Sequence, residues 1–239
     1  MMTTRAAPIR ALLFDLDDTL WPIVPVIQRA EALLFDWLRE HAPAIPQRYT
    51  LAGLRERRVE LMAANPRFQY DLWALRHTGL TEAFEACGED HSKIPHAMAL
   101  FADARNQVTL YEDVAASLPR LAARMTLGSL TNGGADLQAI GLAHHFKISV
   151  AAHTFGSAKP DPAIFHAACD ALELAPAQVA YVGDDLRLDV EGAQKAGLTG
   201  IWLNRSGAAV PAAYAHILPD ANLRTLHELE SWLNHTNGA

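Results

Sequence analysis

The sequence predicts an α/β protein with a mostly parallel sheet and, near its start, an inserted all-helical domain. A short apolar segment, residues 10–16, runs into acidic residues, as expected of a buried parallel strand with an acidic carboxyl end. After about residue 108, strand-like and helix-like segments alternate, which is typical of a parallel sheet covered by helices on both faces. These observations favour a Rossmann-like three-layer core.

The block between these two parts is predicted to be all helical. Residues 26–42 have the apolar spacing of an amphipathic helix, at Val26, Ile27, Ala30, Leu33, Leu34, Trp37 and Leu38. Further helices are expected near residues 50–64, 70–86 and 93–106, with no convincing strand among them. The expected organisation is a core of residues 1–21 and 108–239 and a helical insert, or cap, of residues 22–107.

The second part of the core supplies most of the predicted sheet. Strands are expected at residues 125–130, 179–182 and 200–203, and helices near 112–124, up to about 143, and at 162–173, 187–196 and 222–234. In open α/β sheets, ligands bind beyond the carboxyl ends of the strands. Polar residues at these ends are therefore the candidates for function.

Composition and charge narrow the classes of partner. The chain has 239 residues and a formal charge of −7, so it lacks the basic field that binds nucleic acid or anionic membranes. Cys87 and Cys169 are isolated, which indicates free thiols in a reducing compartment. No apolar run approaches the roughly 20 residues of a membrane span, and the start lacks the apolar stretch of a signal peptide. We expect a cytoplasmic enzyme or binding protein, and nothing in the sequence indicates its oligomeric state.

Three carboxylates lie within four positions directly after the first predicted strand, at Asp15, Asp17 and Asp18. Carboxylates so close repel one another unless a cation, a proton or hydrogen bonds hold them, so a divalent metal ion explains the cluster. A turn in which Asp and Thr cap the next segment explains it as well. This segment by itself leaves both explanations open.

Two later segments place phosphate-binding residue types at the same predicted edge. Thr131 and Asn132 precede two glycines that open a helix, a geometry that offers backbone N–H groups to an anion although such turns are common. Lys159 lies just before another helix, where its charge can balance phosphate and carboxylates, although most lysines are simply solvated.

A fourth segment gives a second acidic strand end, with Asp184, Asp185 and Asp189 after the predicted strand 179–182. Oxygen ligands from two strand ends, completed by a phosphate oxygen and waters, suit Mg²⁺. The four segments contain no His or Cys, which argues against zinc.

Taken in order, the four segments resemble the four motifs of the haloacid dehalogenase superfamily, whose members are mostly phosphatases. The DxDxT pattern of the first segment is distinctive, and the resemblance covers the whole core. It implies a magnesium-dependent phosphatase that hydrolyses a small phosphorylated metabolite through an aspartyl-phosphate intermediate. Asp15 is then the nucleophile, and Asp17 acts first as general acid and then as general base.

The resemblance also implies roles for the remaining segments. Thr131 and Asn132 would contact the phosphoryl group, and Lys159 would orient it. The groups implied to hold Mg²⁺ are Asp15, the Asp17 carbonyl and Asp184, and those implied to support them are Asp185 and Asp189.

The helical cap, lying between the first and second segments, is where the resemblance places substrate choice. Arg67 and Arg76, near helix junctions, are candidates for contacts with the leaving group, with surface solvation as the alternative. Trp21, just after the first segment, either walls the site or anchors a buried hinge.

Two rival functions use the same core residues. A phosphomutase differs in how well its closed site keeps water from the intermediate, and a catalytically silent binding protein would keep the fold alone. The phosphatase is favoured because every expected acid is present. Asp17 argues against a dehalogenase, because a halide leaves without being protonated.

Overall fold

The core of this computed structural model, which describes residues 8–238, is built on one sheet of six strands. The strand order is β3-β2-β1-β4-β5-β6, and all neighbouring strands are parallel. The strands are β1 Ala11–Phe14, β2 Thr126–Thr131, β3 Ile148–Ala151, β4 Val179–Gly183, β5 Thr199–Leu203 and β6 Ala221–Leu223. The predicted α/β class is confirmed.

Strand β1 lies in the middle of the sheet, between β2 and β4, and all four of its side chains are fully buried. Four consecutive apolar residues suit this position because a central parallel strand is covered on both faces. Phe14, its last residue, pairs with Ser129 of β2 and Val182 of β4. This register brings the residues that follow the three strands to one edge of the sheet.

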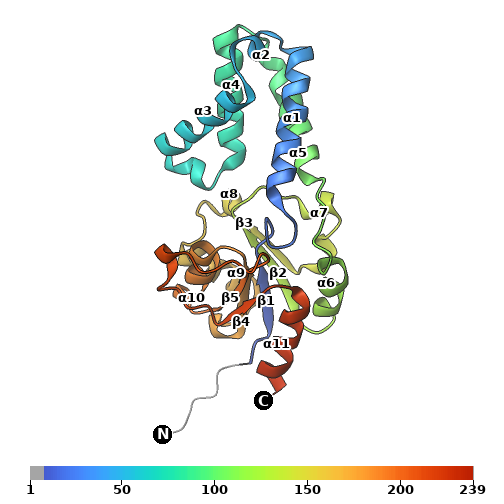
Figure 1. Ribbon diagram of the computed structural model, residues 1–239, viewed down its shortest axis with the longest axis vertical. Coiled ribbons are helices and arrows are strands. Elements are labelled where there is room, and N and C mark those ends of the chain that lie inside the picture. The colour runs from blue at the N-terminus through green and yellow to red at the C-terminus, as the bar shows by residue number, and fades with distance from the viewer. Residues whose placement is uncertain (1–7, 239) are drawn as a thin grey trace. The chain divides into compact units, whose positions relative to one another are not determined.

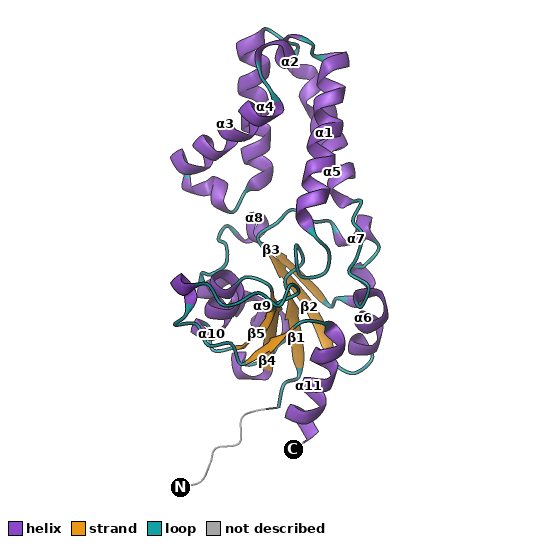
Figure 2. Ribbon diagram, in the orientation of Figure 1, coloured by secondary structure: helices purple, strands orange, loops and turns teal. Residues whose placement is uncertain are grey.

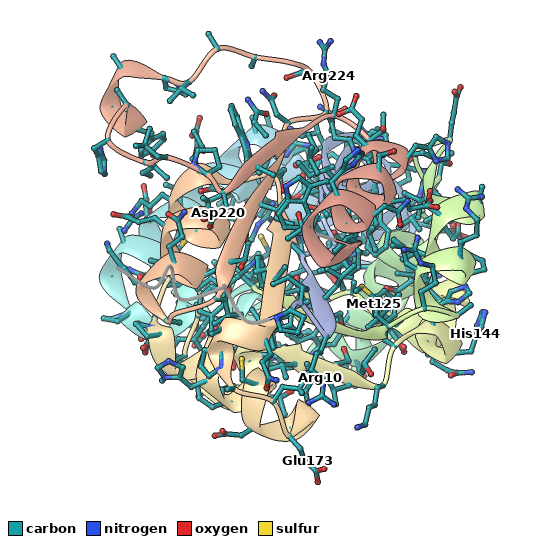
Figure 3. The ribbon with its side chains drawn as sticks, turned by 90° about the horizontal axis from the view of Figure 1, so that it is seen from below. Arg10, Met125, His144, Glu173, Asp220 and Arg224 are labelled. Carbon is teal, nitrogen blue, oxygen red and sulfur yellow. The ribbon has the colours of Figure 1, made fainter. Side chains whose placement is uncertain are left out.

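Helices cover both faces of the sheet (Figure 2). Helices α9 (Pro162–Leu172) and α10 (Gly192–Lys195) pack together on one side, and α6 (Val114–Ala122) and α11 (Leu226–Gly238) pack together on the other. Figure 3 looks onto the amino ends of the strands, where Arg10 and Met125 precede β1 and β2. The acidic segments follow the opposite ends.

Several core elements differ from the expected ones. The helix expected up to residue 143 is only α7, Leu137–Ile140, because Asp136 caps its start and Gly141, at φ 85°, ends it. The short strands β3 and β6 and the helix α8 (Ala152–Phe155) were not expected, and α11 begins later because β6 occupies residues 221–223. A π-helix, Leu186–Glu191, forms the first part of the helix expected at 187–196.

The helical insert forms a compact unit of its own (Figure 1). Its helices are α1 Ile23–His41, α2 Ala44–Arg48, α3 Leu51–Ala64, α4 Leu72–Cys87 and α5 Ile94–Asn106. Its buried apolar centre includes Leu38, Phe84 and Phe101. The unit comprises Pro22–Thr109 together with Gly133–Gly141, so it contains α7, where Asp136 N donates to Asn106 Oδ1 at 3.0 Å. Of the described residues, the core comprises 8–21, Leu110–Asn132 and 142–238.

Among the helices described, none combines the length and the apolar character that crossing a membrane requires.

Candidate active site

The buried side chain of Lys159 joins the acidic ends of β1 and β4. Its Nζ donates hydrogen bonds to Asp15 Oδ1 at 2.7 Å, to Asp189 Oδ1 at 2.6 Å and to Tyr181 Oη at 2.8 Å. An ammonium group has three hydrogens, so these three acceptors account for all of them. Lys159 is therefore held in one position, with its charge directed at Asp15.

Asp15, Asp184 and Asp189 bring carboxylate oxygens within 4.8 Å of one another. Burial raises the pKa of Asp15 well above its usual range, Asp189 and Asp184 raise it further, and the Lys159 ammonium opposes the shift. Burial also raises the pKa of Asp184, to about 7, with Asp189 and Asp18 adding to the effect. One lysine thus faces three acids, and the site favours binding a cation or a proton.

Mg²⁺ fits this donor set. The three acids offer hard oxygen ligands from two strand ends, and the excess of negative charge is what a divalent cation offsets. The grouping includes Asp189, which the sequence predicted only as a supporting residue. The carbonyl of Asp17 was predicted as a ligand from the resemblance and stays a prediction.

The loop after β1 turns back on itself, so that Trp21 lies next to Asp17. Asp18 has φ 58°, a left-handed conformation uncommon for a residue with a side chain, and its N–H donates to the Trp21 carbonyl at 2.8 Å. The Trp21 indole Nε1 then donates to Asp17 Oδ1 at 2.9 Å. Thr19 Oγ1 donates to Asp184 Oδ1 at 3.2 Å, so the same loop contacts the β4 end.

Asp185 and Asp189, both predicted as supporting residues, occupy different environments. Asp185 Oδ1 accepts from the backbone N–H groups of Arg187 and Leu188, which makes it the N-cap of the following helix. Asp189 is 1% exposed and accepts from Lys159 and from Asp185 N. Gly183 makes room for it, because a Cβ there would lie 2.3 Å from Asp189 Oδ2.

The predicted phosphate-binding residues lie at the end of β2. Thr131 is buried as its last residue. Asn132 uses both ends of its amide on Lys159, donating to Lys159 O at 3.0 Å and accepting from Lys159 N at 2.9 Å. Asn132 therefore positions the lysine backbone, and its contact with a phosphoryl group stays a prediction.

Three residues that support the site were missed in the sequence. Tyr181 accepts from Lys159 and donates to Leu130 O at 2.7 Å. Trp202 donates to Asp184 O at 2.8 Å. Arg205 donates to Thr19 O, and its Nη1 donates to both carboxylate oxygens of Asp113 at 2.7 Å. Of the three, Tyr181 could have been noticed in the sequence, because its hydroxyl group lies inside the otherwise apolar segment 179–182 and needs a hydrogen-bond partner when buried.

The three substrate candidates have distinct settings. Trp21 is fully buried, which agrees with the hinge-anchor alternative for this residue. Arg67 is exposed and pairs with Asp71 at 2.8 Å. The side chain of Arg76 is 11% exposed within the insert, paired with Glu31 at 3.3 Å and stacked over Phe101 at 3.5 Å, so surface solvation does not describe it. Contacts of Arg67 and Arg76 with a substrate stay predictions.

Comparison with known proteins agrees with the resemblance noted in the sequence. The sequence model of the haloacid dehalogenase-like hydrolases matches residues 9–197. The chain is 29% identical to the 5-amino-6-(5-phospho-D-ribitylamino)uracil phosphatase YigB of Escherichia coli, over 93% of this chain and 95% of that protein. It is 32% identical to a phosphoserine phosphatase of Thermus thermophilus, over 82% and 89%.

A solved structure shares the whole fold. The crystal structure described as a 2-haloacid dehalogenase from Pseudomonas syringae superposes with a TM-score of 0.87 at 37% identity, covering 95% of this chain and 99% of that one. Proteins described as phosphatases thus match the sequence, and a structure described as a dehalogenase matches the fold. The chain belongs to the haloacid dehalogenase-like hydrolases.

Proposed function

We propose that this hydrolase is a magnesium-dependent phosphatase that acts on a small phosphorylated metabolite through an aspartyl-phosphate on Asp15. The observation that carries the proposal is the Asp15 carboxylate, held by Lys159 at 2.7 Å and followed two residues later by a second acid, Asp17. The relatives described as phosphatases support the reaction class.

The residues have complementary tasks in the two half-reactions. Asp15 attacks phosphorus, and the bond from phosphorus to the ester oxygen breaks as Asp17 gives that oxygen its proton. Asp17 then takes a proton from water as the water oxygen attacks phosphorus and the Asp15–phosphorus bond breaks. Lys159 balances charge on the phosphoryl oxygens and on Asp15. Asp15 and Asp184 would help to hold Mg²⁺, which would supply positive charge that offsets the repulsion between the nucleophile and the phosphate.

The direct test is phosphate release from p-nitrophenyl phosphate in the presence of Mg²⁺. Asp15→Asn should reduce release to background and chelation should abolish it, because the first removes the nucleophile and the second the cation. Asp170→Asn, an exposed change on α9, serves as the matched control and should keep wild-type activity. Full magnesium-dependent turnover by Asp15→Asn would contradict the proposal.

Dehalogenation is the second candidate, supported by the similarity to the Pseudomonas syringae structure. Asp17 argues for the phosphatase because only an alkoxide leaving group needs its proton. Incubation with 2-chloropropionate, followed by measurement of chloride, separates the two: chloride release that survives chelation, without phosphatase activity, would establish the dehalogenase.

A phosphomutase and a silent binding protein are separated by the same preparations. A panel of phosphorylated metabolites, scored by catalytic efficiency for free phosphate and for isomerised sugar phosphate, distinguishes hydrolysis from transfer. We expect free phosphate to dominate. No turnover of any ester under varied divalent metals would favour the binding protein.

A further inference from the structure

The indole of Trp21 makes a hydrogen bond to the acid that the proposed reaction needs. Trp21 Nε1 donates to Asp17 Oδ1 at 2.9 Å, and the indole is fully buried. An indole has a single N–H and accepts nothing, so this bond fixes the orientation of both partners. The contact lies within the core unit, and both residues belong to the loop after β1.

The loop is built so that the indole reaches back to Asp17. The Asp18 N–H donates to the Trp21 carbonyl at 2.8 Å, Leu20 N donates to Leu16 O at 2.8 Å, and Asp18 adopts φ 58°. Arg205 holds the Thr19 carbonyl with two nitrogens, at 3.1 and 2.8 Å. These contacts hold a turn with one residue in an uncommon backbone conformation, so the indole N–H stays beside the Asp17 carboxyl group.

We propose that Trp21 is a positioning residue for the general acid, fixing the carboxyl group of Asp17 through this hydrogen bond. The inference rests on the proposed phosphatase function. The bond to Oδ1 holds the carboxyl group in one orientation, from which it gives a proton to the ester oxygen as the phosphorus–oxygen bond breaks and takes one back from the attacking water.

Two esters with rings of similar size but different leaving groups give the test. The p-nitrophenolate of p-nitrophenyl phosphate leaves without help, whereas the benzyl alkoxide of benzyl phosphate needs a proton. Trp21→Phe should therefore lower kcat/KM for benzyl phosphate about tenfold more than for p-nitrophenyl phosphate, a part of what a general acid contributes. The ratio of the two values does not depend on how much enzyme is folded, so partial misfolding does not hide the effect.

Matched variants separate positioning from packing. Trp202→Phe also removes a buried indole donor, but this donor contacts the Asp184 carbonyl at 2.8 Å, so the ratio should stay at its wild-type value. In the Asp17→Asn background, Trp21→Phe should not change the ratio further, because the acid is already absent. Trp21→His, which can keep a ring N–H donor, should restore part of the ratio.

An unchanged ratio in Trp21→Phe overturns the inference and leaves the phosphatase proposal standing. An equal change in Trp202→Phe, or a further change in the Asp17→Asn background, also overturns it. Absence of phosphate release from both esters by the wild-type enzyme removes the proposed function, and this inference with it.

Discussion

The core and the helical insert each contain a buried ion cluster, with opposite excess charge. In the core cluster, Lys159 contacts Asp15 and Asp189, and Asp184 lies beside them. In the insert cluster, the carboxylate of Glu31 contacts three guanidinium groups, those of Arg55, Arg58 and Arg76. The first has more acids than bases, and the second more bases than acids.

The two clusters differ in how the excess is relieved. Arg55 is 43% exposed, so water solvates one of the extra positive charges, and Arg76 stacks over the Phe101 ring. In the core cluster, Lys159 and Asp189 are almost completely buried. Burial without a compensating charge is costly for carboxylates. The insert cluster therefore relieves part of its excess charge through water and an aromatic ring, although Arg76 Nη1 is buried without a hydrogen-bond partner in the described part of the chain. The core cluster has no such relief and needs a cation or a proton.

The largest effect is expected from Lys159→Met. This change leaves the carboxylates of the core cluster without a counter-charge and removes the positive charge that we propose balances the phosphoryl oxygens. We expect kcat/KM to fall by about a thousandfold, the upper end for losing one group that stabilises charge in the transition state. Lys195→Met is the control, because Lys195 is 58% exposed and pairs with Glu191 on the surface of α10. A loss smaller than tenfold in steady-state assays would show that the core cluster tolerates its own charge.

Glu31→Gln tests the insert cluster. Removing the charge leaves the mostly buried guanidinium groups of Arg58 and Arg76, whose side chains are 16% and 11% exposed, without a counter-charge. We expect the free energy of unfolding in urea to fall by about 3 kcal/mol. Glu60→Gln, at an exposed pair with Arg57, should change it by less than about 1 kcal/mol. Equal effects would mean that the buried cluster contributes no more than a surface pair.

The stability of the metal-free protein should depend on pH, because the core cluster holds more negative than positive charge. Burial raises the pKa of Asp184 from 3.8 to about 7, so the folded state binds this proton more tightly than the unfolded state. Stability is therefore highest below about pH 4 for this group and is lost as pH rises towards 7. Above pH 7, Mg²⁺ binding should restore stability, raising the free energy of unfolding by about 2.7 kcal/mol at a concentration of one hundred times its Kd.

Thermal unfolding with and without Mg²⁺, from pH 5 to pH 8, measures both effects. The variant Asp184→Asn should show a smaller slope with pH and a weaker response to Mg²⁺, and the slope that remains comes from Asp15, whose pKa is also raised by burial. A wild-type protein that becomes more stable as the pH rises without metal would contradict the assignment for Asp184.

The smallest effect is expected from relieving the turn beside the core cluster. Asp18 and Glu173 both adopt positive φ, at 58° and 59°. Replacing either residue with Gly should raise the free energy of unfolding by about 1 kcal/mol, since Gly adopts this conformation without strain. Asp18→Gly should gain more, because the Asp18 charge also raises the pKa of Asp184. Equal gains in urea unfolding would show that charge repulsion from Asp18 is negligible.

The strands and helices with strong periodicity were predictable from sequence. Strand β1 follows from its continuous apolar run, and α1 and α9 from their helical spacing. Strand β3, however, is a partly buried edge strand of four residues, and such short segments carry little pattern. The helix expected to reach residue 143 failed because capping at Asp136 and Gly141 outweighs the propensity of the segment.

By itself, the sequence determined the parallel core, the helical insert and the identity of the acids, because these depend on local periodicity and on residues at strand ends. Only the tertiary structure decided that Lys159 contacts Asp15, Asp189 and Tyr181 together, and that Asp185 caps a helix instead. Equally hidden was the bond from Trp21 to Asp17, which depends on the positive φ of Asp18. Charge balance and hydrogen bonding within a buried site depend on side-chain positions in space, which the order of residues along the chain does not specify.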